Sequence, residues 1–314
     1  MLAKQNRMVV LGLTTAIAMG VAGCGAQAAP TAKPLAVVNG QNITPSDWHA
    51  AVATTDLLQG TKLPTTTAAK KQQVTELAQQ VAVDQWAVKN HVISNKKASQ
   101  EASTFIKKNV TATLGGSSKV AASLKKYHIT SSQMQSFLTQ EMILQAAFTK
   151  KTSSISSLPK GTGTAFYKAH PSYFVSPTKA EVRMILVKTQ SEANKLLGEI
   201  KKGASFSALA KKYSLDPSKS KGGSLGWVPL GAQSGFVPAF YQEMDKLKPG
   251  QYGIAHTQFG WHVIEVQAIK KGSLQSYSTV KSQIQQTLLQ QKKNQVFTAF
   301  VKGLMKKSKV TYHV

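Results

Sequence analysis

The chain has 314 residues, 42% of them hydrophobic, and a formal net charge of +26 at pH 7. This length and composition suit a globular protein of about two domains and argue against a disordered chain. The charge comes from 39 basic residues against 13 acidic ones, yet only Arg7 and Arg183 are arginines. Because specific nucleic-acid recognition relies on arginine forks, we expect no nucleic-acid partner. A lysine-rich surface instead favours electrostatic association with anionic lipid or wall polymers.

The first predicted element is an export signal. A basic start precedes an apolar run, Met8 to Ala22, which is shorter than the span of about 20 residues that crosses a membrane. Cys24, the only cysteine, ends the sequence Val21-Ala22-Gly23-Cys24, which resembles a bacterial lipobox. We therefore expect a lipoprotein signal peptide at 1–23, lipidation of Cys24 and a tether at 24–34. The protein would be lipid-anchored to the cell membrane on its extracytoplasmic face. The alternative is an ordinary secretory signal with an incidental cysteine.

Residues 35–177 predict a mainly helical region. "LAVV" and residues 41–43 read as two short extended pieces around a turn. From 66 to about 151, apolar residues recur at helical spacing. The Ser-, Gly- and Pro-containing segment 153–164 then reads as a linker.

Between residues 178 and 271 the pattern becomes mixed. The predicted strands are 180–188, 252–256 and 261–269, and the predicted helices are 192–201, 206–213 and 238–246. Short strands alternating with helices indicate a compact α+β domain.

The C-terminal part, 272–314, predicts one long helix from Tyr277 to Lys307 and a final strand. The helix carries an apolar stripe that needs a partner, and the N-terminal helical region is the natural one. The closing "KVTYHV" would add a strand beside "LAVV". The expected fold class is therefore α+β, with a mixed domain inserted into a mainly helical domain formed by the N- and C-terminal parts.

Two common classes of chemistry find little support. The chain has no HExxH pair, no cysteine cluster and no dense run of carboxylates, so we expect neither a metal site nor a cofactor. "GGSLG" at 222–226 fits a hydrolase nucleophile motif around Ser224, and Asp245 and His262 follow in the order of that class. That motif requires a strand before the serine and a helix after it. The flanking "DPSKSK" and "WVP" predict loop and extended chain, which argues against a hydrolase.

Four segments of the mixed region together carry a family resemblance. "AEVRMILVK", "SLDPSKSKGGSLGW", "GFVPAFYQEM" and "TQFGWHVIEV" occur in the order seen in parvulin-type peptidyl-prolyl isomerase domains, which residues 178–271 resemble from end to end. With an export signal, helical flanks and a long C-terminal helix, the whole mature chain is similar to the PrsA-type foldases of Gram-positive bacteria. The resemblance implies a chaperone role for the helical parts. It implies unfolded or emerging secreted polypeptides as partners.

The resemblance also implies site residues. It places Leu225, Phe236 and Phe240 in the wall of a proline pocket, Asp216 at a polar position beside the amide, and His262 as an active-site histidine. Each has a structural alternative that the residues alone leave open. The three apolar side chains could be plain core. Asp216 before a proline could open a turn, and a lone histidine in an apolar strand could be structural.

Met184 departs from the family pattern, because relatives place the first histidine of an active-site pair there. A thioether cannot donate a strong hydrogen bond or change its charge near neutral pH. Phe259 stands where many relatives have a small polar residue. We count Met184 and Phe259 among the substrate-binding residues.

Two hypotheses follow. The first is a membrane-anchored foldase whose peptidyl-prolyl isomerase activity is weakened by Met184. The second is a holdase-type chaperone with a catalytically silent parvulin domain. A solute-binding lipoprotein is a third class, but the chain lacks the two-lobed α/β pattern of such proteins.

Overall fold

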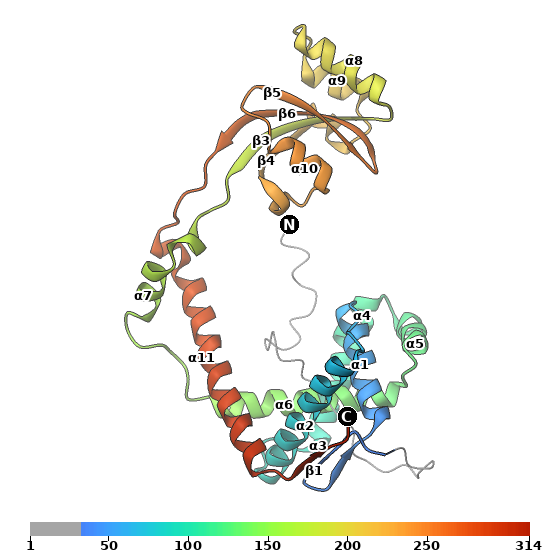
Figure 1. Cartoon of the computed structure of the whole chain (residues 1–314), viewed down its shortest axis with the longest axis vertical. Coiled ribbons are helices and arrows are strands. Elements are labelled where there is room, and N and C mark those ends of the chain that lie inside the picture. The colour runs from blue at the N-terminus through green and yellow to red at the C-terminus, as the bar shows by residue number, and fades with distance from the viewer. Residues whose placement is uncertain (1–32) are drawn as a thin grey trace. The chain divides into compact units, whose positions relative to one another are not determined.

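The computed structural model describes residues 33–314, so Cys24 and the predicted signal peptide lie outside the described residues. The chain divides into two compact units (Figure 1). The helical unit contains the described residues up to Leu158 and also Gln286–Val314, and the mixed unit is Pro159–Gln285. The mixed unit is therefore an insertion in the helical one, which confirms the predicted fold class. Within residues 33–314, no helix combines the length and hydropathy needed to span a membrane.

The helical unit is built around one long helix, α6 (Ser131–Thr152), which packs against α1, α2 and α3. Its other helical elements are α1 (Pro45–Gln59), α2 (Thr67–Lys89), α3 (Asn95–Phe105), the π-helical η2 (Ile106–Val110), α4 (Thr111–Leu114) and α5 (Ser117–Lys126). Capping explains why α6 begins where it does. Thr130 Oγ1 accepts the Gln133 N–H at 3.1 Å, and the Gln133 side chain accepts the Thr130 N–H at 2.8 Å.

Residues from both ends of the chain share the core of this unit. Leu77 and Leu138 are fully buried in its larger cluster. In a second cluster, Phe297 of the C-terminal helix α11 (Tyr277–Lys307) meets Phe148 edge-on at 5.2 Å between ring centroids. The expected packing of the second half of this helix against the N-terminal helices is therefore present.

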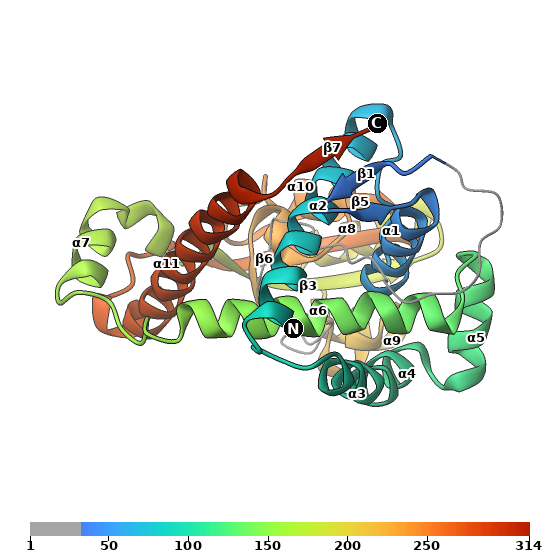
Figure 2. The same ribbon diagram turned by 90° about the horizontal axis from the view of Figure 1, so that it is seen from below.

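A small antiparallel sheet joins the two chain ends within the same unit. Its strand order is β2-β1-β7, from β2 (Gln41–Ile43), β1 (Ala36–Val38) and β7 (Val310–Tyr312). Val38 is directly opposite Val310, and Figure 2 shows the last strand running beside the first. This confirms the strand expected from "KVTYHV".

The mixed unit contains a four-stranded antiparallel sheet of order β4-β3-β6-β5. The strands are β3 (Lys179–Val187), β4 (Ser224–Pro229), β5 (Gln251–Thr257) and β6 (Gly260–Lys270). Three of them were expected, but β4 was not, because Gly226 and Pro229 are turn-type residues. It forms because it is an edge strand that pairs only with β3, through an irregular register, and edge strands tolerate glycine and proline.

Helices cover both faces of this sheet (Figure 1). They are α8 (Gln190–Lys201), α9 (Phe206–Tyr213) and α10 (Pro238–Met244), with 3-10 turns η4 (Pro217–Lys221) and η5 (Gly231–Ser234). Ile185 and Val187 of β3 pack with α8 and α9, whereas Val182 and Met184 pack on the α10 side. A central strand covered on both faces is apolar almost throughout, as β3 is.

The remaining part of the mixed unit is rich in aromatic side chains that contact one another. It contains α7 (Thr162–Ala169), η3 (Pro171–Phe174) and the first turns of α11. Tyr167 Oη donates to the Gln275 carbonyl at 2.6 Å, and Gly163 lies against the side chains of Tyr277 and Ile284. The first part of the α11 stripe thus packs against α7 in the mixed unit, whereas we had expected the whole stripe to pack against the N-terminal helices.

Candidate active site

Met184 and His262 lie on the same face of the sheet. In the antiparallel pairing of β3 with β6, Met184 is opposite Ile264 and Leu186 is opposite His262. Residues two apart on a strand share a face, so Met184 and His262 are diagonal neighbours on the α10 side. Long side chains can reach one another at such positions. A side chain at position 184 can therefore meet His262 across the sheet.

The imidazole of His262 is buried, with a hydroxyl group at one ring nitrogen and an aromatic ring beside it. It is 5% exposed, and its Nε2 lies 2.8 Å from Thr257 Oγ1. Phe240 meets the ring edge-on, with centroids 5.2 Å apart. The second ring nitrogen, Nδ1, is buried and has no hydrogen-bond partner among residues 33–314. Leaving a buried polar atom unpaired costs about 1–3 kcal/mol, so a bound group that paired with Nδ1 would recover part of that energy.

Burial lowers the pKa of His262 below the usual histidine value of 6.5. The Asp216 carboxylate opposes this by favouring the imidazolium, and His256 adds to the lowering. The folded protein therefore disfavours the protonated ring, and the stability that the neutral ring contributes is lost as the pH falls below about 6.5. At neutral pH His262 is an uncharged imidazole, able to donate from one nitrogen and accept at the other.

Asp216 opens a turn at the edge of this face. Its Oδ1 accepts the Ser218 N–H at 2.8 Å, which caps η4. Ser214 Oγ accepts both the Asp216 N–H at 3.2 Å and the Leu186 N–H at 3.1 Å, which ties the turn to β3. Asp216 is thus the turn residue that its place before Pro217 suggests. Its carboxylate also acts on the pKa of His262, so the turn belongs electrostatically to the site.

The three residues expected in the pocket wall lie together on the same side. Phe240 is 2% exposed, and Phe236 packs against it with 4.6 Å between ring centroids. Phe236 and Leu225 are only partly buried and pack against the core cluster that contains Met184. Phe240 is therefore both a core residue and part of the apolar wall of the site. Phe236 and Leu225 are the members with surface left for a ligand.

Phe259 is mostly outside the core. It lies in the turn between β5 and β6, its side chain is 61% exposed, and its N–H donates to Thr257 Oγ1 at 3.1 Å. Because most of its side chain is exposed to water, Phe259 contributes little buried apolar surface to the stability of this unit. Its position two residues after Thr257 connects it to the His262 hydrogen bond.

Sequence reasoning missed two residues of this site. Gly223 has φ +83°, and a side chain there would collide with the Met184 carbonyl, while its own carbonyl accepts the Met184 N–H at 2.9 Å. The adjacent glycines were a visible signal for it. Thr257 gave no comparable signal, because its role depends on the pairing of β5 with β6, which places Ala255 opposite His262.

Replacing Thr257 with Val should destabilise the mixed unit by about 1–3 kcal/mol, because His262 Nε2 would lose its hydrogen bond to Thr257 and the Phe259 N–H its acceptor. Hydrogen exchange at the amides of β5 and β6 measures this loss. Thr257→Ser keeps the hydroxyl and should stay close to wild type. Equal exchange in the Val and Ser variants would show that the hydroxyl does not hold His262.

The hydrolase alternative finds no assembled triad. Ser224 begins a strand instead of a helix, and its Oγ accepts the Gly226 N–H at 3.3 Å. Asp245 accepts the Gly231 N–H at 3.0 Å, and His262 is bonded to Thr257. Among residues 33–314, no group of three or more His, Cys, Asp or Glu side chains has the arrangement of a metal site.

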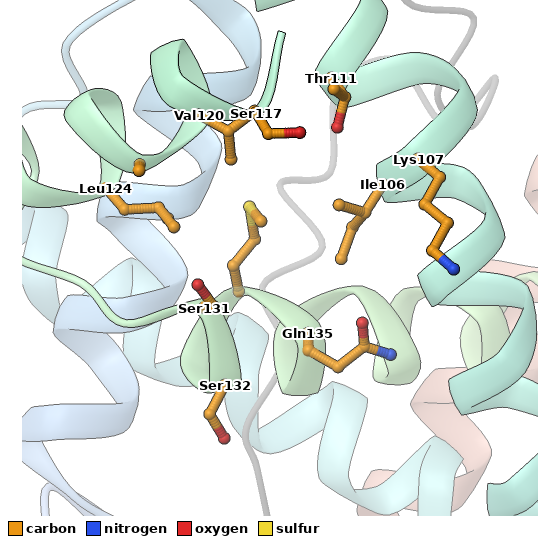
Figure 3. A pocket seen from close by; sticks show the side chains of 11 residues that line it. Ile106, Lys107, Thr111, Ser117, Val120, Leu124, Ser131, Ser132 and Gln135 are labelled. Carbon is orange, nitrogen blue, oxygen red and sulfur yellow. The ribbon is translucent and has the colours of Figure 1, made fainter.

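A pocket of about 530 Å³ lies in the helical unit (Figure 3). Met134, Val120, Leu124 and Ile106 supply its apolar part, and the remaining lining is mostly hydroxyl and amide side chains. Among the lining residues within 33–314, Lys107 is the one that titrates, so this described part of the lining offers binding surface and no acid–base pair.

Comparison with known proteins identifies the mixed region. The family described as "PPIC-type PPIASE domain" matches residues 172–270. A foldase protein PrsA from Clostridium botulinum (strain Loch Maree) is 29% identical over 194 residues, covering 61% of this chain and 57% of that protein. Foldase protein PrsA from Clostridium acetobutylicum is 37% identical over 139 residues, covering 44% and 41%. The chain thus spans about half the length of the curated relatives it matches.

Among solved structures, the peptidylprolyl isomerase PrsA from Bacillus anthracis aligns with 73% of this chain and 95% of its own, at 21% identity and a TM-score of 0.34. Residues 172–270 are a parvulin-type peptidyl-prolyl isomerase domain, and PrsA foldases are homologues of the chain.

Proposed function

We propose that the protein is a foldase that acts on secreted polypeptides outside the cytoplasm and catalyses cis–trans isomerisation of Xaa-Pro bonds. One observation carries the proposal: within a parvulin-type domain, His262 is held by Thr257 and packed edge-on against Phe240, beside the apolar wall. This arrangement supports the proposal, because a polar group beside an apolar wall is what binding a prolyl amide requires.

The chemistry asked of such a site is modest. Rotation about an Xaa-Pro bond is opposed by amide resonance, with a barrier of about 18–20 kcal/mol. No covalent bond breaks. A site lowers the barrier by binding the twisted amide more tightly than either planar form. The apolar wall of Phe236, Phe240 and Leu225 would hold the proline ring and exclude water. The carbonyl before the proline would then rotate while the ring stays in place.

The polar groups would act on the amide itself. As the amide twists, resonance is lost and the proline nitrogen gains a lone pair that accepts a hydrogen bond. The neutral imidazole of His262 would orient the groups around this amide, and a partner on its unpaired Nδ1 would fix the ring in place. The Asp216 carboxylate would polarise the imidazole from the edge of the site. None of these residues needs to change its charge during turnover.

The location and partners rest on the sequence. Cys24 would be lipidated and anchor the chain to the extracytoplasmic face of the cell membrane. The lysine-rich surface would draw the protein toward anionic lipid or wall polymers. Emerging secreted polypeptides are the proposed clients, and the pocket of the helical unit is a further surface for binding them.

A second candidate is a holdase whose parvulin domain binds peptides without isomerising them. It is favoured by Met184, which is 6% exposed and sits where an imidazole would be needed to pair with His262 Nδ1. The apolar wall is intact in either case, so the two candidates differ in rate, not in binding.

The deciding measurement is the cis-to-trans relaxation of a Xaa-Pro peptide in the presence of catalytic amounts of the full chain. We expect acceleration, and a threefold to tenfold loss on His262→Ala, roughly the contribution of one hydrogen bond. Trp227→Ala is the matched control, because Trp227 is 45% exposed and stands outside the apolar cluster of the site. Peptide binding with an unchanged relaxation rate would support the holdase instead.

A further inference from the structure

Two large apolar side chains of the mixed unit are exposed at the same end of the site. Phe259 is 61% exposed and Leu215 is 52% exposed. Leu215 precedes the turn residue Asp216, and Phe259 lies in the turn between β5 and β6. Neither belongs to the two core clusters of the mixed unit. Their exposure therefore has no explanation in the folding of this unit.

Both side chains flank the last residues of β3. On one side, the Leu215 N–H donates to the Leu186 carbonyl at 2.8 Å, so the chain at 214–216 runs beside β3 where β4 has ended. On the other side, Gly260, next to Phe259, lies against the Val187 carbonyl and the Leu186 side chain. Leu186 is half-buried and points to the same face as Met184 and His262. Leu186, Leu215 and Phe259 thus surround one end of the candidate active site, and we call them the apolar rim.

The backbone of the rim is fixed before any ligand arrives. Leu215 is bonded to β3, and the Phe259 N–H is bonded to Thr257 Oγ1 at 3.1 Å. A backbone that is already fixed loses little further freedom on binding, which leaves more of the contact energy as affinity. The rim therefore has the character of a preformed subsite.

A series of contacts leads from the proline wall to the apolar rim, and it indicates which part of a substrate would reach the rim. Phe240 of the proline wall touches His262, His262 is bonded to Thr257, and Thr257 is bonded to Phe259. The rotating amide would lie at His262, with the proline ring toward Phe240. What lies across the amide from the ring is the residue that precedes the proline.

We propose that the apolar rim is a specificity subsite that accepts a large apolar side chain immediately before the proline. This deepens the proposed function, since it rests on the same site and names its preferred substrates. Clients would then be engaged at Leu-Pro or Phe-Pro sequences of unfolded chains, which are exposed only before folding buries them. An acidic residue before the proline would meet carbon surface here.

The test uses the full chain and a peptide series with Leu, Phe, Ala or Glu before the proline. For each peptide, kcat/KM of isomerisation and Kd by fluorescence anisotropy are measured. We expect Leu and Phe to exceed Ala by about tenfold in both quantities, as partial burial of such a side chain allows. Phe259→Ser and Leu215→Ser should each reduce this ratio to about threefold or less, and Trp227→Ser should leave it at the wild-type value.

The outcomes separate the inference from the function on which it rests. Equal Kd values for Leu and Ala peptides, or tighter binding of the Glu peptide, would overturn the apolar subsite even if isomerisation is fast. Absence of any rate acceleration would overturn the isomerase, while the Kd ratio would still decide the subsite. A ratio that survives in both Ser variants would place the selectivity elsewhere.

Discussion

Replacing Met184 with His is expected to raise kcat/KM for Xaa-Pro isomerisation roughly tenfold, the effect of one additional hydrogen bond in the transition state. Met184 is a diagonal neighbour of His262 on the same sheet face, and His262 Nδ1 is buried there without a partner. A thioether is at best a weak acceptor. An imidazole at this position would pair with Nδ1 and fix both the tautomer and the ring orientation of His262.

Met184→Leu is the matched control, because it keeps an apolar side chain of similar volume and adds no donor. We expect its kcat/KM to stay within about twofold of wild type, as volume-conserving apolar exchanges usually do. Because position 184 is 6% exposed, thermal unfolding of both variants must show that they are folded. A folded Met184→His variant with wild-type kcat/KM would mean that the pairing of His262 does not limit the reaction.

The sequence predicted the parts of this site that depend on local pattern. β3 and β6 follow from apolar runs bounded by turn residues, and the long helix Tyr277–Lys307 from its spacing and length. Met184, Asp216 and His262 followed from the resemblance of whole motifs. The structural alternatives also hold for two of the predicted site residues. Phe240 is buried in the core, and Asp216 caps a turn.

What could not be predicted depends on strand register and on contacts between distant segments. Thr257 matters because the hairpin of β5 and β6 places it diagonally from His262, and a shift of the pairing by one residue would turn it to the other face. Leu215 belongs to the rim because the chain after α9 returns to β3. Neither the position of Thr257 nor that of Leu215 can be predicted from amino-acid composition or from the spacing of apolar residues.

The same limit applies to a pair of carboxyl groups inside the helical unit. Glu141 of α6 is 4% exposed, and its Oε1 accepts the Gln80 side-chain N–H at 3.4 Å. Asp84 lies one helical turn after Gln80 on α2, and its buried Oδ1 has no hydrogen-bond partner in the described part of the chain. The two acids are far apart in sequence, and only the packing of α2 against α6 brings them together.

Burial raises the pKa of Glu141 from its usual value of 4.5 to about 8. The pKa of Asp84 is also raised well above its usual value, first by burial and then by repulsion from Glu141. The folded protein therefore binds protons at this pair more tightly than the unfolded chain does. Linkage then requires that the stability contributed by Glu141 falls as the pH rises from about 4.5 to about 8, and Asp84 acts in the same direction. Neighbouring Glu76, whose pKa burial also raises, acts in the same direction.

Glu141→Gln should remove the share of this dependence that comes from Glu141 and from its repulsion of Asp84, because an amide is neutral at every pH and can still accept the Gln80 hydrogen bond. Above about pH 8 we expect the variant to unfold with a free energy a few kcal/mol higher than wild type, and near about pH 5 we expect the two to be similar. Hydrogen exchange at the amides of α2 and α6 reports this unit separately from the mixed one. Glu101→Gln, at an exposed position on α3, is the control and should follow wild type throughout. If wild-type protection in these helices is the same at about pH 5 and about pH 8.5, Glu141 titrates like a solvated carboxyl group and burial does not govern it.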